Sequence, residues 1–82
     1  MIDEHEWRSV LQVAKDGTFS AAAKHLYISQ PSLSQCIKKV ETELGVRLFD
    51  RSQTPLALTT AGEIYVRQAK EILRIRQALV QE

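Results

Sequence analysis

The stretch YISQPSLSQCIKKVE, residues 27–41, decides the fold of this 82-residue chain. Ser29 is a residue type that caps helices, and Pro31 falls in the first turn, where its missing N–H costs no hydrogen bond. The proline therefore favours the start of a helix instead of breaking one. Gly45 is the residue type that most often follows the end of a helix, so we expect a helix over residues 30–44.

The predicted helix has two unlike faces when its residues are placed at 100° intervals. Around Leu33 lies an apolar face that we expect in the core, made of Cys36, Ile37, Val40 and Leu44. The opposite face is neutral to basic with short side chains, made of Pro31, Ser34, Gln35, Lys38 and Thr42. Glu41 and Glu43 lie only on the flanks. A slim outer face without acids indicates a helix that is inserted into another molecule.

Two helices are expected before this one. Residues 3–16 have Asp3 as a cap, Gly17 as the terminating glycine and an apolar stripe at helical spacing, made of Trp7, Val10, Leu11 and Ala14. Residues 19–26 repeat the helical spacing, with Ser20 as the expected cap. Their run of three alanines allows a neighbouring helix to approach closely.

After Gly45 the pattern changes to a hairpin and then to one long helix. Leu56 and Leu58 alternate around Ala57 with the period of a strand, and the simplest interpretation is a two-stranded wing. Thr60 and Glu63 form a capping-box pattern, so a helix is expected from residue 60 to the end, with a length of roughly 30 Å.

The apolar face of the long helix is longer than the first three helices can cover. It either caps the small core of one chain or forms a dimer interface, and we favour the interface. The residues expected in it are Tyr65, Val66, Ala69, Ile72, Leu73 and Leu79.

Together these elements predict a mainly α fold, a winged helix-turn-helix of three helices plus a two-stranded wing, followed by a long linker helix. The winged domain is expected over residues 1–59, with the helix-turn-helix at about 19–38. The linker and dimerisation helix is expected over residues 60–82.

The composition excludes several classes of protein. A net charge of +1 does not by itself identify a nucleic-acid binder. No apolar run is long enough for a membrane span, and the acidic amino terminus does not resemble a secretory signal, so we expect a cytoplasmic protein. One cysteine and two histidines provide no disulfide, metal site, cofactor site or catalytic constellation, so no enzyme is expected. Cys36 is interpreted as a small core residue.

In a helix-turn-helix the second helix of the pair enters the major groove of DNA. Gln30 is suited to adenine, Ser34 and Gln35 can donate or accept, and Lys38 can reach guanine or phosphate. Duplex DNA is therefore the expected partner. The alternative is a helical interaction and dimerisation module that does not bind DNA, although such a helix would carry apolar anchors on its outer face.

The stretch GTFSAAAKHLYISQPSLSQCIKKVETELGVRLFDRS, followed by LTTAG, resembles the DNA-binding region of LysR-type transcriptional regulators. The resemblance implies a bacterial regulator that dimerises through antiparallel linker helices and frequently forms tetramers. It implies base contacts at Gln30, Pro31 and Ser34, and backbone or nearby contacts at Ser29, Ser32, Lys38 and Arg51. Family members usually continue into a domain that binds a small-molecule effector. Nothing here corresponds to that domain, so we expect a fragment or a truncated form.

Two features depart from the family pattern, the cysteine at position 36 and the wing tip. The wing tip reads Ser52, Gln53, Thr54 instead of carrying arginine or lysine, which predicts weak contacts from the wing to phosphates. Arg51, at the base of the wing, has an alternative role as a structural partner of Asp50 or of another nearby acid.

Overall fold

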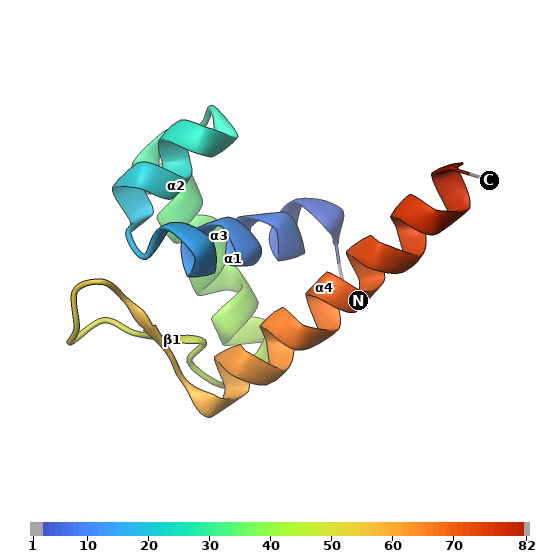
Figure 1. Ribbon diagram of the computed structural model, residues 1–82. Coiled ribbons are helices and arrows are strands. Elements are labelled where there is room, and N and C mark those ends of the chain that lie inside the picture. The colour runs from blue at the N-terminus through green and yellow to red at the C-terminus, as the bar shows by residue number, and fades with distance from the viewer. Residues whose placement is uncertain (1–2, 82) are drawn as a thin grey trace.

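The computed structural model describes residues 3–81, in which four helices surround a small core and one short hairpin projects from it (Figure 1). The elements follow in the order α1 (Glu4–Asp16), α2 (Phe19–Leu26), α3 (Gln30–Leu44), β1 (Phe49–Asp50), β2 (Ala57–Leu58) and α4 (Thr60–Gln81). The predicted mainly α fold, with three helices, a two-stranded wing and a long last helix, is confirmed. The predicted end of that helix at Glu82 lies outside the described residues.

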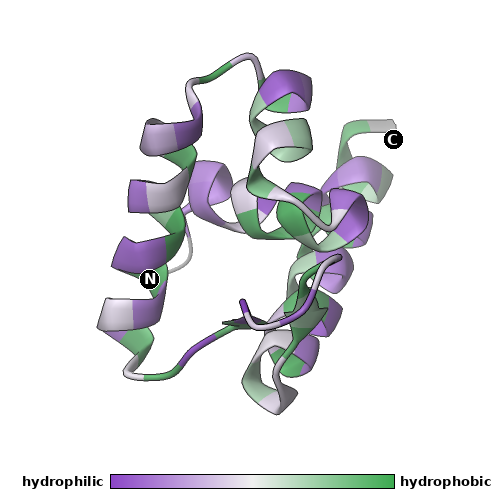
Figure 2. Ribbon diagram, turned by 90° about the vertical axis from the view of Figure 1, so that its left-hand side faces the viewer, coloured by the Kyte–Doolittle hydropathy of each residue, from purple (hydrophilic) through white to green (hydrophobic). Residues whose placement is uncertain are grey.

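The core lies where α1, α2 and α3 meet the base of the wing. It consists mainly of Val10, Val13, Ala22, Ala23, Leu33, Ile37, Val40, Leu48, Phe49 and Val66. Figure 2 shows the hydrophobic segments of the helices turned toward the middle of the domain and the hydrophilic segments turned outward. Trp7 is buried as expected, whereas Leu44 is 51% exposed and lies outside the core in which it was expected. Leu44 instead lines an open apolar groove beside the start of α4.

Helix capping explains most of the element boundaries. Asp3 accepts a hydrogen bond from the His5 backbone N–H (2.8 Å), and Gly17 ends α1 in the left-handed conformation (φ 77°), as expected. The cap of α2 is Thr18 and not Ser20, because the Thr18 hydroxyl accepts from the Ala21 N–H. Thr18, two positions before Ser20, has the extended backbone that a capping residue requires.

The cap of α4 also differs from the expected one by a single residue. The Thr59 hydroxyl accepts from the Gly62 N–H at 3.0 Å and donates to the Arg47 carbonyl at 2.6 Å. Thr60 is therefore the first helical residue, and the predicted capping box of Thr60 with Glu63 is wrong. Thr59 serves two purposes at once, because it starts α4 and fixes the chain that leads into the wing.

The wing is short and is held by the helices on both sides. Phe49 pairs with Leu58 and Asp50 with Ala57 in an antiparallel register. The Phe49 ring packs edge-on against Phe19 of α2, with 6.4 Å between the ring centroids. On the returning arm, the Leu56 N–H donates to the Gly17 carbonyl at 2.8 Å. A two-stranded hairpin is marginal in water by itself, so these contacts define its position.

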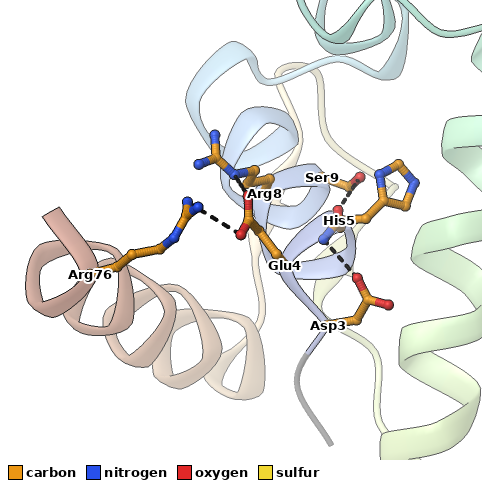
Figure 3. A network of polar contacts seen from close by, with 6 residues as sticks. All are labelled: Asp3, Glu4, His5, Arg8, Ser9 and Arg76. Carbon is orange, nitrogen blue, oxygen red and sulfur yellow. Dashed lines mark hydrogen bonds and ion pairs between the residues drawn. The ribbon is translucent and has the colours of Figure 1, made fainter. Parts of the chain in front are cut away.

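The first half of α4 belongs to the folded domain. Val66 and Ala69 are buried where α4 packs against α1. Farther along, Arg76 forms an ion pair with Glu4 at 3.2 Å, and Figure 3 shows this arginine reaching from α4 to the start of α1, where Arg8 contacts the same carboxylate. The last turns of α4 extend away from the rest of the domain (Figure 1). Within residues 3–81, none of the helices combines the length and hydropathy that a membrane span requires.

A polar cluster joins the end of α1 to α2 and predicts a measurable pKa change. The Asp16 carboxylate lies 2.8 Å from His25 Nδ1 and accepts from Gln12 Nε2 at 2.8 Å, and these contacts, that with His25 first, hold the pKa of Asp16 below its ordinary value of 3.8. In a His25→Ala variant the Asp16 pKa is expected to rise toward that value in an NMR titration. Asp50 is the control, because its lowered pKa depends on Ser52.

The same contact gives the sign of a pH effect on stability. A carboxylate with a lowered folded-state pKa stabilises the fold above the unfolded pKa, and this contribution is lost as the pH falls through the folded pKa. The free energy of unfolding of the parent chain should thus fall more than that of His25→Ala as the pH drops below 3.8. Parallel pH dependences would contradict the assigned contact.

Candidate nucleic-acid interface

The start of α3 is fixed by a pair of serines. The Ser29 hydroxyl accepts from the Ser32 N–H at 3.2 Å and donates to the Ser32 hydroxyl at 2.8 Å. Pro31 lies in the first turn, as expected. Before it, Tyr27 ends α2 with a left-handed backbone (φ 59°) and is 94% exposed. The tight turn between α2 and α3 therefore presents the amino end of α3 on the surface of the domain.

The two faces of α3 are separated as the sequence predicts. Leu33, Ile37 and Val40 are buried. On the outer face Ser34 is half-buried, and the remaining side chains expected at the site are exposed: Ser29, Gln30, Pro31, Ser32, Gln35 and Lys38. Cys36 is half-buried at the edge of the core. The outer face is open, narrow and free of carboxylates, so it can approach a polyanion without charge repulsion.

Arg51, the remaining residue expected at the site, lies at the base of the wing and has two protein contacts. Its guanidinium donates to Glu41 Oε1 at 3.2 Å and lies 5.3 Å from the centre of the Phe19 ring. The alternative, a structural pair with Asp50 or another nearby acid, is therefore confirmed, and the acid is Glu41. Asp50 instead accepts from the Ser52 N–H and hydroxyl and so shapes the wing turn. The Arg51 side chain remains 35% exposed.

Glu41 is an important residue of the site that sequence reasoning left without a role. Its carboxylate accepts from the Leu48 N–H at 2.7 Å and from the Phe49 N–H at 3.4 Å, in addition to Arg51. The side chain is only 10% exposed. The position of Glu41 on the flank of α3 did not indicate this role, because its hydrogen-bond partners lie seven to ten residues farther along the chain. Glu41 connects α3 to the wing and orients Arg51.

A groove of about 560 Å³ lies between α3 and the base of the wing. It is lined by Ser34, Lys38, Glu41, Thr42, Gly45, Val46, Arg47 and Arg51. The groove brings Lys38 and Arg51, both expected at the site, to the same surface and adds Arg47, which was not expected there. Arg47 follows the glycine that ends α3, in a segment without helical or strand periodicity, so the sequence pattern did not indicate which surface it faces. Among residues 3–81, no group of histidine, cysteine and carboxylate side chains is arranged to hold a metal ion.

Comparisons with known proteins identify the family. Residues 5–63 match the family described as bacterial regulatory helix-turn-helix protein, lysR family. This match covers more than half of the chain, and the chain therefore belongs to the LysR family.

Individual relatives agree with this assignment. The chain is 46% identical over 71 residues to the transcriptional regulator YcgK of Bacillus subtilis (strain 168), a match that covers 87% of the chain and 22% of YcgK. It is 38% identical over 82 residues to the regulator BsdA of the same strain, covering 98% of the chain and 28% of BsdA. The chain thus spans about a quarter of the length of these relatives.

A solved structure shows the same fold in a protein bound to DNA. The BenM DNA-binding domain in complex with catB site 1 DNA matches the chain with a TM-score of 0.92 and 30% sequence identity. The match covers 98% of this chain and 90% of that one. The mainly α architecture with a two-stranded wing is thus that of a LysR DNA-binding domain.

Proposed function

We propose that this chain binds duplex DNA in a sequence-specific manner as the DNA-binding part of a bacterial transcriptional regulator. The observation that carries the proposal is the outer face of α3, which is exposed, acid-free and built on a buried inner face. A major groove is about 12 Å wide and accepts one helix, and a slim face lets the backbone of that helix approach the bases. The proposed role is binding and not catalysis, and it places the chain in the bacterial cytoplasm, where the DNA lies.

The proposed base contacts come from Gln30, Pro31, Ser34 and Gln35. Gln30 is the first residue of α3 and Ser34 lies one turn later on the same side, so both face the floor of a groove that receives the amino end of the helix. Ser29 and Ser32 are adjacent at the helix start, where free N–H groups favour a phosphate. Lys38 and Arg51 are farther from the amino end and suit the DNA backbone.

Selection of bound sequences from a random duplex pool tests the proposal. We expect enrichment of one motif with two-fold symmetry, because a symmetric dimer presents two copies of α3. A pool that shows no enrichment, even at low salt, would contradict DNA binding. A chain that dimerises but enriches no sequence would instead be a helical interaction module.

Replacing Gln30 by alanine is expected to relax the sequence preference. One lost bidentate contact to a base typically costs about 1–3 kcal/mol of discrimination at that position. The measurement compares the affinity of parent and variant for the selected motif and for single-base variants of it. Lys24→Ala is the control, since Lys24 is exposed on α2 outside the proposed set. If Gln30→Ala retained the full preference, the assignment of α3 as the helix that reads bases would be wrong.

We also propose that two copies of the chain associate through α4, by a set of residues that differs in part from the one the sequence suggested. Val66 and Ala69 are buried against α1 and are therefore occupied within one chain. At 100° per residue, Ile64, Ile75 and Leu79 lie together on the other side of the helix. They are 50%, 46% and 72% exposed, and we name them, together with the half-buried Ile72, the outer stripe.

The outer stripe continues into an apolar groove of about 310 Å³ at the start of α4, whose lining includes Trp7, Leu44, Val46 and Ile64. Two α4 helices packed antiparallel would place the carboxyl end of each outer stripe against the groove of the partner. Such a contact is self-complementary, as a two-fold dimer requires. The exposed Leu44 then has a partner, and Tyr65, at the edge of both surfaces, belongs to the same interface.

A further inference from the structure

The groove between α3 and the wing contains a residue to which the proposed DNA contacts assign no role. Arg47 lines this groove together with Lys38 and Arg51. The three cations come from two sides, Lys38 from α3 and the two arginines from the segment after Gly45. One carboxylate, that of Glu41, lies among them.

The charge available to a ligand in this groove is positive. Glu41 accepts hydrogen bonds from two backbone N–H groups and Arg51, and its side chain is 10% exposed, so its negative charge is already compensated. Within the described part of the chain, no ion pair joins Lys38 or Arg47 to a carboxylate. The neighbouring Lys39 differs, because it pairs with Glu6 of α1 at 3.4 Å.

The backbone around Arg47 is fixed on both sides. The Arg47 carbonyl accepts from the Thr59 hydroxyl at 2.6 Å, and the next residue, Leu48, donates its N–H to Glu41 at 2.7 Å. Leu48 is fully buried, whereas the Arg47 side chain is exposed. The position from which the guanidinium extends is therefore set before any ligand arrives, which lowers the entropic cost of binding.

We propose that this groove binds the phosphodiester backbone of one DNA strand, with Arg47 as a phosphate ligand beside Lys38 and Arg51. The inference rests on the proposed DNA binding and extends it to a site at the carboxyl half of α3. Ser34 and Lys38 belong both to the outer face of α3 and to the groove lining. A strand whose bases face the amino end of α3 therefore passes directly into the groove. Glu41 is a positioning residue that orients Arg51 and does not contact the strand.

The test measures how the affinity for a duplex selected from the random pool depends on salt. Each phosphate neutralised by a cation contributes about 0.9 to the slope of log affinity against log salt concentration. Arg47→Ala is expected to lower the slope by about 0.9 for each chain bound, thus by about 1.8 for a dimer that occupies both half-sites. Arg47→Lys should retain most of the slope, because a lysine also neutralises a phosphate.

Arg67→Ala is the matched control. Arg67 is exposed on α4, and its replacement removes the same charge at a position outside the groove. Thermal unfolding of each variant checks that the fold is intact. We expect it to be intact in Arg47→Ala, because the Arg47 side chain is exposed. An unchanged slope in Arg47→Ala, or an equal drop in Arg67→Ala, would overturn the inference. If the parent chain selects no duplex at all, the proposed function itself fails. If the parent binds a duplex and Arg47→Ala has the same salt dependence, only the role of Arg47 fails.

Discussion

Replacing Gly62 by alanine is expected to destabilise the domain by about 3 kcal/mol, although it lies in a helix, where alanine is normally preferred. A Cβ atom at this position would lie 2.0 Å from the Leu48 carbonyl oxygen and 3.0 Å from the Leu48 carbonyl carbon. The obstacle is backbone, and it has little freedom to move. The Leu48 carbonyl accepts from the Thr59 N–H, and the Leu48 N–H donates to Glu41.

The sign of the stability change in Gly62→Ala shows whether the steric clash with Leu48 or the higher helix propensity of alanine dominates. Without the close approach, a change from glycine to alanine inside a helix would stabilise the protein by up to about 1 kcal/mol. Urea denaturation of both proteins measures the difference. Gly45→Ala is the comparison variant: its Cβ would meet nothing within 4 Å, so only the left-handed backbone (φ 73°) opposes it, at a cost of about 1–2 kcal/mol. A Gly62→Ala protein as stable as the parent would show that α4 does not begin against Leu48.

Introducing glutamate at both Ile64 and Ile75 is expected to convert the proposed dimer to monomers. Each isoleucine buried in an interface contributes about 1.5–3 kcal/mol, and a two-fold dimer loses four of them. Since about 1.4 kcal/mol corresponds to a tenfold change in affinity, the dimer dissociation constant should rise by at least 100-fold, even with strong non-additivity. Sedimentation equilibrium over a range of concentrations measures it.

The control for this experiment is Lys70→Glu, which makes the same change of two charge units at an exposed position on the side of α4 away from the outer stripe. It should leave the dimer intact. Circular dichroism should show that the double variant retains its helices, because Val66 and Ala69 still pack against α1. The double variant should also lose affinity for a two-fold symmetric duplex while single half-sites bind weakly in both proteins. A dimer that persists in the double variant would mean that the outer stripe is not the interface.

The sequence predicted the elements of the fold because their signals are local. Ser29, Pro31 and Gly45 define the ends of α3 from residue type alone, and the structure confirms them. The caps at Thr18 and Thr59 were each assigned to a later residue, because Ser20 and Thr60 carry equally suitable hydroxyls. Which hydroxyl caps the helix depends on where the extended backbone ends, and tertiary contacts decide this. Thr59, for example, is held by its bond to the Arg47 carbonyl.

The less predictable parts of the site depend on contacts between distant residues. The pairing of Arg51 with Glu41 requires the wing to fold back along α3, and no periodicity of either segment contains this information. The two apolar sides of α4 present a different difficulty. Val66 and Ile75 are equally apolar in the sequence, yet the first is buried in its own domain and the second is 46% exposed. Periodicity finds apolar positions but does not say which neighbour covers them.

The packing of α4 against α1 has a mechanical consequence for the proposed dimer. One side of the first half of α4 is buried against α1, which in turn packs against α3, so the direction of α4 is set relative to α3. The pair of α4 helices would then fix both the separation and the relative rotation of the two α3 helices in the dimer. One added base pair between half-sites rotates them by about 35°, because a turn of duplex contains about 10 base pairs. In the proposed complex, the length of the spacer between the two half-sites would therefore contribute to recognition.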